Sequence, residues 1–337
     1  MAAPRKRNLK LTRFSRAYQN RLERGWTLVC FWAHCLAIDL NATLCNVDVA
    51  NEKLESFVQW CYTQHYTYHD VKHALLACQH RYTHLRFRIR SAWDQMCSWS
   101  LELSIHNRVP MPLLILRALT ITSMMTATAC DPTSPDRCKY CIFAVMLQVG
   151  FHGLLRPREI FCLKVKHIMA TADGVCLVLI DPKNRFAMGR VQHCLIRSLM
   201  IREWMLWVIE GLKPDSYIWP FSLAAARSVM QELRRRRGLM GTPFSLASLR
   251  AGGATERYMS GVSIPRLLFM GRWRSLSSLS CYIQEAVASL VLAQLDNSKL
   301  REFEALISLT SFLERPPPVP WSQLFKRPTE QRQSRTC

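Results

Sequence analysis

The chain has 337 residues, 49% of them apolar, and a formal net charge of +21. This length favours two domains, and the apolar share excludes a globally disordered chain. The excess of positive charge favours nucleic acid as a partner over a merely soluble basic protein, because long-range attraction and counterion release both promote binding to phosphates. No apolar run free of charged residues reaches the ~20 residues that span a bilayer, so no membrane partner is expected.

Residues 1–25 form a basic segment that contains a single acid, Glu23. We interpret this segment as a DNA-contacting arm, ahead of a nuclear address or an organellar presequence. The chain has 14 cysteines, and the segment lacks an apolar signal core, which indicates a reducing compartment. We therefore expect the nucleus in a eukaryote and otherwise the cytoplasm or nucleoid, with an organelle as a further alternative.

Three cysteines, Cys130, Cys138 and Cys141, include a C-x-x-C pair with the spacing of zinc ligands. A fourth ligand at a suitable spacing is missing, because the nearest candidate, His152, lies inside an apolar helical run. We expect thiols without a metal. No Gly-rich nucleotide loop is present either, so we expect no cofactor and no small-molecule substrate.

Apolar residues recur at helical spacing in the first third of the chain, at about 26–40, 70–82 and 85–101, and in a helix that Asn51 is expected to cap. These helices predict a small bundle. Two stretches rich in proline and turn-forming residues follow, at 108–112 and 131–135. We place the domain boundary between them. The sequence thus predicts a helical domain over 26–125, a second domain over 126–312 and a Pro-rich, polar tail over 313–337.

The second domain combines helices with one hairpin. Residues 175–180 are apolar and β-branched, and they are predicted to pair with 189–196 across a loop that carries Lys183, Asn184 and Arg185. Helical patterns cover most of the rest, at about 138–152, 157–165, 198–210, 223–237, 245–259, 264–270, 275–292 and 298–313. The predicted fold class is therefore mainly α with a small antiparallel β-sheet.

Three short motifs occur in order in the second domain. The first is Leu-Leu-Arg156-Pro-Arg-Glu159, the second is Ser-Leu-Arg250-Ala-Gly-Gly, and the third is Gly-Arg-Trp273, with Tyr282 nine residues later. In their order and gaps they resemble the boxes of the tyrosine recombinase, or integrase, family. From Arg250 to Tyr282 the spacing is especially similar to a Cre-like catalytic domain.

The resemblance covers 138–295 well, and 26–120 only by size, helicity and position. It implies a two-domain architecture, with a helical core-binding domain and an α+β catalytic domain, and an origin in a mobile element. It also implies double-stranded DNA as the substrate, with a homo-tetramer on two duplexes held together by C-terminal helices. A last helix packed on its own domain is an equal alternative.

Cleaving a DNA strand requires an in-line nucleophile, neutralisation of charge on the phosphate and a proton for the leaving oxygen. The resemblance implies that Tyr282 attacks and forms a 3′-phosphotyrosine, which conserves bond energy for rejoining. Arg156 and Arg250 suit the phosphate clamp because a guanidinium offers a planar fork with permanent charge. Glu159 would steady the first arginine, and Trp273 can donate an indole hydrogen bond to the phosphate.

A lysine at a hairpin tip can reach the leaving 5′-oxygen as a general acid, and Lys183 is the best placed. Its nearest rival, Arg185, carries a guanidinium that does not give up its proton. A basic run further along is interpreted as a DNA-phosphate face or a solvated helix end. It consists of Arg234, Arg235, Arg236 and Arg237.

One position departs from the family pattern. The residue three before the second-box arginine is usually histidine, and here it is Ala247, which can neither donate nor accept a proton. Losing one such group costs on the order of 10²–10³ in rate. His193, near the hairpin, is a candidate replacement. The sequence therefore leaves three hypotheses: an active recombinase, a catalytically impaired DNA-binding protein derived from one, and a type IB topoisomerase.

Overall fold

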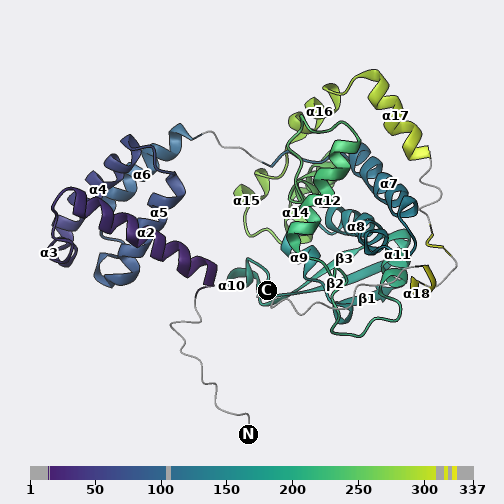
Figure 1. Ribbon diagram of the computed structural model, residues 1–337, viewed down its shortest axis with the longest axis horizontal. Helices are drawn as coiled ribbons and strands as arrows, with labels where there is room; N and C mark the ends of the chain where they lie inside the picture. The colour runs from purple at the N-terminus through teal and green to yellow at the C-terminus, as the bar shows by residue number, and fades with distance from the viewer. Residues whose placement is uncertain (1–13, 15, 104–107, 309–314, 318–320, 325–337) are drawn as a thin grey trace, which may run out of the picture. The chain divides into compact units, whose positions relative to one another are not determined.

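The computed structural model describes residues 14, 16–103, 108–308, 315–317 and 321–324, and Figure 1 shows its elements. The chain forms two compact units, residues 1–106 and residues 107–337. The basic residues of the predicted arm up to Arg13 and most of the predicted tail over 313–337 lie outside the described residues.

The first unit is a helical bundle, as predicted. Its elements are α2 (Arg16–Cys35), α3 (Leu40–Cys45), α4 (Val47–Thr63), α5 (Tyr68–Arg81), the 3-10 helix η1 (Thr83–Leu85) and α6 (Arg90–Glu102). Trp32 and Phe57 meet edge to face in its core, with ring centroids 5.2 Å apart. The side chain of Asn46 caps α4. The predicted cap, Asn51, instead lies within α4 and bonds Ser91.

Helix α2 takes in the second half of the predicted basic arm. Leu22 and Gly25 are buried, and a Cβ at Gly25 would lie 2.6 Å from the backbone nitrogen of Ala74 in α5. Only glycine allows the two helices to approach this closely. Residues 16–25 therefore belong to the bundle, and the arm prediction is wrong for this part, because two buried positions are hidden among charged ones.

The second unit is built around α7 (Leu113–Ala129) and α8 (Pro135–His152), which pack along each other. Leu119 of α7 and Phe143 of α8 belong to one buried cluster that fills the centre of this unit. The predicted boundary at 125/126 therefore differs from the structural division, which places the whole of α7 in the second unit. Of the two turn-rich stretches, the first ends at the start of α7 and the second only joins two packed helices.

The sheet has three antiparallel strands in the order β1-β2-β3: β1 (Ile168–Thr171), β2 (Gly174–Ile180) and β3 (Val191–Ile196). The predicted hairpin is confirmed, with Val175 opposite Ile196 and Ile180 opposite Val191. Strand β1 was not predicted, because four residues give too short a pattern to separate a strand from a loop. In Figure 1 the sheet lies along one side of the α7 and α8 pair.

Short helices complete the second unit. They are α9 (Pro157–Phe161), η2 (Val165–His167), α10 (Arg185–Met188), α11 (Leu199–Ile209), α12 (Leu223–Arg236), α13 (Ser248–Met259), α14 (Ile264–Gly271), α15 (Leu276–Ser280), α16 (Glu285–Ala293), α17 (Asn297–Ser308) and α18 (Trp321–Leu324). The fold class is mainly α with a small antiparallel sheet, which confirms the prediction.

One stretch, Leu276–Ala293, has the length and mean hydropathy, 1.4, of a membrane span. The predicted single helix over 275–292 is divided in the structure, since α15 ends at Ser280 and α16 begins at Glu285. A bilayer core offers no partners for the backbone groups that such a break exposes. The break instead holds Tyr282 at the edge of a polar cluster, described below.

Candidate active site

The first predicted arginine stands at the start of α9. Pro157 occupies the first helical position, and the N–H of Arg156 donates to Glu159 Oε2 at 2.9 Å. The Arg156 guanidinium donates to the other carboxylate oxygen at 2.7 Å. The predicted pairing of these two residues is thus present. Leu154, two residues earlier, has a left-handed backbone with φ 48°, which costs energy for a residue with a Cβ.

The second predicted arginine lies on α13 and points into the protein. Arg250 is 1% exposed, and its guanidinium donates to the carbonyl of Leu154 and, at 2.6 Å, to that of Gly271. Small residues let α13 approach α8, since a Cβ at Gly253 would lie 2.2 Å from the carbonyl oxygen of Phe151. Burial and the neighbouring arginines lower the pKa of Arg250, yet a guanidinium stays charged across the physiological range.

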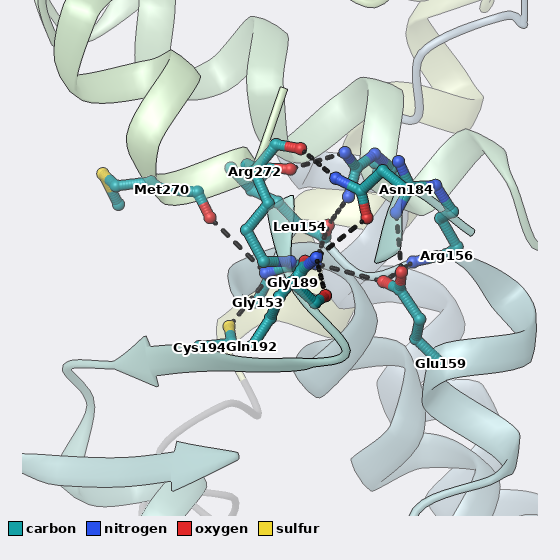
Figure 2. Close-up of polar contacts among 12 residues, drawn as sticks. Gly153, Leu154, Arg156, Glu159, Asn184, Gly189, Gln192, Cys194, Met270 and Arg272 are labelled. Carbon is teal, nitrogen blue, oxygen red and sulfur yellow. Dashed lines mark hydrogen bonds and ion pairs between the residues drawn. The ribbon is translucent and has the colours of Figure 1, made fainter. Parts of the chain in front are cut away.

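A third arginine, which the sequence analysis missed, completes the cluster. Arg272 ends α14 in the left-handed conformation, with φ 57° and ψ 42°. Its guanidinium donates to Glu159 Oε2 at 3.0 Å and to the carbonyl of Leu154 at 3.3 Å. Figure 2 shows Arg156 and Arg272 meeting at the one carboxylate. The sequence did contain a signal for this residue, because Arg272 directly precedes Trp273 in the third motif.

The carboxylate of Glu159 is held ionised by this arrangement. Burial acts to raise its pKa, but the guanidiniums of Arg272 and Arg156 and the Arg156 N–H outweigh burial, so the pKa is lowered. Hydrogen bonds and opposite charges favour the ionised form of an acid. Glu159 therefore acts as a fixed anion that orients cations, and it is not placed to donate a proton.

Trp273 and Tyr282 lie against the buried arginine. The centre of the Trp273 ring is 5.2 Å from that of Tyr282, and the guanidinium carbon of Arg250 is 4.2 Å from the first ring and 5.3 Å from the second. Such contacts stabilise a buried cation. The indole N–H of Trp273 is buried and, within the described part of the chain, has no hydrogen-bond partner.

The backbone around the tyrosine is fixed by Thr255 of α13. Its hydroxyl donates to the carbonyl of Tyr282 at 3.0 Å and accepts from the N–H of Gln284 at 3.2 Å. The sequence analysis did not single out Thr255, because a threonine inside a helix gives no signal of such a contact. Tyr282 itself is half-buried, at the junction of α15 and α16.

The hairpin loop is tied to the same cluster. The Asn184 side chain donates to the carbonyl of Arg272 at 2.7 Å and accepts from Gln192 at 3.1 Å, as Figure 2 shows. Lys183, next in the loop, is exposed. It lines a groove of about 780 Å³ together with Arg156 and Glu159. The groove is strongly basic; its further cationic lining residues are Arg158, Lys164, Lys166 and Arg185.

Neither Ala247 nor the candidate replacement His193 supplies the group of the missing histidine. Ala247 is the residue before α13 and makes no side-chain cap. His193 lies on the exposed face of β3, whereas its neighbours Gln192 and Cys194 are buried on the opposite face. Side chains alternate along a strand, so His193 points away from the cluster. The prediction that His193 replaces the histidine is wrong for this reason.

The basic run at the end of α12 divides into two kinds of residue. Arg234 donates to the carbonyls of Leu239, Met240 and Thr242, and Arg237 binds Thr122 and Glu302. The three partners of Arg234 lie in the segment that follows α12, and the two partners of Arg237 lie in α7 and α17, so both side chains hold elements of the unit together. Arg235 and Arg236 share Glu232 and stay largely exposed. A DNA contact thus stays a prediction, and it fits the second pair better.

The three cysteines that include the C-x-x-C pair, Cys130, Cys138 and Cys141, differ in their surroundings. Cys138 and Cys141 are buried in the core of the second unit, whereas Cys130 is only half-buried. In the described ranges no three potential ligands among His, Cys, Asp and Glu gather closely enough to hold a metal ion.

The fold is that of the tyrosine recombinases and integrases. Among solved structures, the integrase of transposon Tn1549 in complex with transposon right-end DNA is similar to this chain with a TM-score of 0.56 and 11% identity, over 88% of this chain and 96% of that one. The same integrase with circular-intermediate DNA gives a TM-score of 0.49 at 10% identity, over 71% and 84%. XerH recombinase bound to palindromic difH substrate gives 0.46 at 14%, over 75% and 68%.

By sequence, the chain matches no described family and no curated protein. The likeness of fold rests on the Tn1549 integrase with right-end DNA, and it confirms the predicted architecture.

Proposed function

We propose that this chain is a site-specific DNA recombinase, which cleaves and rejoins DNA strands through a covalent bond between Tyr282 and the 3′-phosphate. One observation carries the proposal: the ring of Tyr282 lies 5.3 Å from the buried guanidinium of Arg250. Arg250 and Arg272 both donate to the carbonyl of Leu154, so the two guanidiniums lie close together. A phosphate bound by these cations would lie beside the phenol. The basic groove next to Arg156 supports a path for the DNA backbone.

The chemistry follows from the groups present. The phenol oxygen of Tyr282 attacks phosphorus while the bond to the 5′-oxygen breaks, and the leaving oxygen takes a proton from Lys183. The phenol proton passes to water, because Ala247 cannot accept it. Arg156 and Arg250 offset the charge that develops on the non-bridging oxygens. The reverse reaction with a 5′-hydroxyl of another strand rejoins the DNA.

Arg250 must become accessible during this reaction. Two of its N–H groups bind carbonyls and its Nε–H has no partner in the described part of the chain, so donors remain for a phosphate. Because the residue is only 1% exposed, the groups that cover it have to move first. Exchange between two duplexes uses one nucleophile for each of four strands, and we therefore propose a tetramer of this chain on DNA.

A trapping experiment tests the proposal. Duplexes that bind the Tyr282→Phe protein are selected from a random-sequence library, and nicked versions are then incubated with wild-type protein. We expect a denaturant-resistant protein–DNA adduct on a peptide that contains Tyr282, and none with Tyr282→Phe. Binding without any wild-type adduct would overturn the proposal.

Binding without an adduct would favour the alternative, a DNA-binding protein that derives from a recombinase and has lost catalysis. Ala247 is the observation in its favour, since a neighbouring donor or base is missing at the start of α13. Relaxation of supercoiled plasmid without sequence preference would instead favour a topoisomerase.

A further inference from the structure

We propose that Arg272 is a positioning residue whose charge neutralises Glu159, so that Arg156 and Arg250 keep their full positive charge for the phosphate. The inference rests on the proposed function. It assigns a role to a residue of the third motif that the sequence analysis left without one. Three independent features of Arg272 carry it: its backbone, its burial and its partners.

The backbone of Arg272 is in a conformation that favours glycine. A left-handed residue at a helix C-terminus is usually glycine, because the Cβ of other residues costs roughly 1–2 kcal/mol there. With φ 57°, Arg272 bears this cost. Strain of this kind persists where other contacts over-determine the residue, and it concentrates at functional sites.

Burial makes the side chain costly as well. The Arg272 side chain is 5% exposed, against 21% for Arg156, and a buried charge is tolerated only when it is paired. Its Nε–H is buried without a hydrogen-bond partner in the described part of the chain, as is that of Arg250. The cluster thus offers more donors than its carbonyls and carboxylate can accept.

The balance of charge points to a missing anion. Three guanidiniums surround the single carboxylate of Glu159, so the cluster has an excess of positive charge. Without Arg272, the charge of Glu159 would cancel that of Arg156, which is the one of the three clustered arginines that lines the groove. With Arg272 present, two cations stay uncompensated, which suits a five-coordinate phosphorus that carries more negative charge than the diester.

Arg272 acts without touching DNA in this arrangement. Its guanidinium faces Glu159 and the Leu154 carbonyl, and its own carbonyl accepts from Asn184 beside Lys183. The residue therefore contributes through charge and through the position of its neighbours.

The test compares two substrates and three variants. Arg272→Gly removes the charge and relieves the backbone strain, which favours a folded variant, and Arg272→Lys keeps a cation. Arg301→Gln, on the exposed side of α17, is the control for net charge. Rates of covalent adduct formation are measured on a nicked duplex with an ordinary scissile phosphate, and on the same duplex with a neutral methylphosphonate there.

We expect Arg272→Gly to slow adduct formation by at least about 10-fold on the phosphodiester and by less than about 3-fold on the methylphosphonate, because the neutral substrate develops less charge. Arg272→Lys is expected to retain most of the rate on both. Equal losses on both substrates would show a merely structural role and overturn the inference. The absence of any wild-type adduct would instead defeat the proposed function, so the two failures are distinct.

Discussion

The hydroxyl of Thr255 donates a hydrogen bond of 3.0 Å to the backbone carbonyl of Tyr282, and so joins the arginine helix α13 to the tyrosine. Both the guanidinium of Arg250 and this hydroxyl project from the same helix. Any displacement of α13 is thereby shared between Arg250 and Tyr282, the proposed phosphate clamp and nucleophile. The relative position of the two groups is fixed by one short element.

Replacing Thr255 by valine tests this link. Valine keeps the shape but removes the hydroxyl, which leaves the Tyr282 carbonyl without this donor and the Gln284 N–H without this acceptor. We expect adduct formation to slow by about 10- to 100-fold, since small misplacement of a nucleophile is costly, while DNA binding measured by gel shift is unchanged. Thr255→Ser, which keeps the hydroxyl, is the control. Equal rates for the serine and valine variants would contradict the prediction.

The candidate site in the second unit was predictable because its signals are local. Arg156, Glu159, Arg250, Trp273 and Tyr282 occur in short motifs at fixed spacing, and the hairpin follows from an apolar, β-branched run with turn residues on either side. The structure brings these motif residues together in one cluster.

Contacts between distant segments were not predictable in the same way. Arg272 is 113 residues from its partner Glu159, and Asn184 is 88 residues from the carbonyl that it binds. No periodicity in a single sequence records such pairs. The wrong boundary for the arm has the same origin, since the contact of Gly25 with α5 depends on a helix about 50 residues away.

The role of Lys183 can be separated from binding by changing the leaving atom. Lys183→Met is expected to slow cleavage by about 10²- to 10⁴-fold on normal DNA, the range for loss of a general acid. A duplex with sulfur in place of the bridging 5′-oxygen needs no proton on its leaving group, so its cleavage by the variant should approach the wild-type rate. If Arg185→Met, the matched variant in the same loop, shows this pattern instead, the assignment of the acid moves to that position.

The ionised state of Glu159 predicts a pH-dependent contribution to stability. Because its pKa is lowered from an ordinary value of 4.5 in the folded chain, the carboxylate stabilises the fold above pH 4.5, and this contribution is lost as the pH falls through the folded pKa. We expect Glu159→Gln to unfold more easily than wild type in urea at pH 7, by about 3 kcal/mol, since three cations lose their counterion.

Below pH 4.5 the difference between the two proteins should shrink, because the carboxyl of unfolded wild type takes up a proton first and that of the folded chain follows at lower pH. Glu304→Gln, at an exposed position on α17, should show no such change. A difference between Glu159→Gln and wild type that stays constant from pH 7 to pH 3.5 would contradict a lowered pKa.

Ala247→His restores the group that the family pattern has at this position. The residue is half-buried immediately before α13, so a new imidazole can reach the neighbourhood of Arg250. We expect adduct formation to rise by at least about 10-fold at pH 7, as part of the roughly 10²- to 10³-fold that one well-placed donor or base contributes. Ala247→Leu adds bulk without a proton and should give no increase. A histidine variant no faster than wild type would show that this position does not limit the reaction.

Gly252 determines how closely α13 approaches the segment that precedes α7. A Cβ there would lie 2.1 Å from the carbonyl oxygen of Met111, whose N–H donates to the Ser248 carbonyl at 3.1 Å. Alanine favours a helix over glycine by about 1 kcal/mol. The overlap with the Met111 carbonyl costs more, because the hydrogen bond from Met111 to Ser248 holds this backbone against α13. We expect Gly252→Ala to destabilise the chain by at least about 2 kcal/mol and to lower Tm by about 5 °C. Gly241→Ala, where no atom lies within 4 Å of the added Cβ, should leave Tm unchanged, and equal melting of the two variants would disprove the close contact.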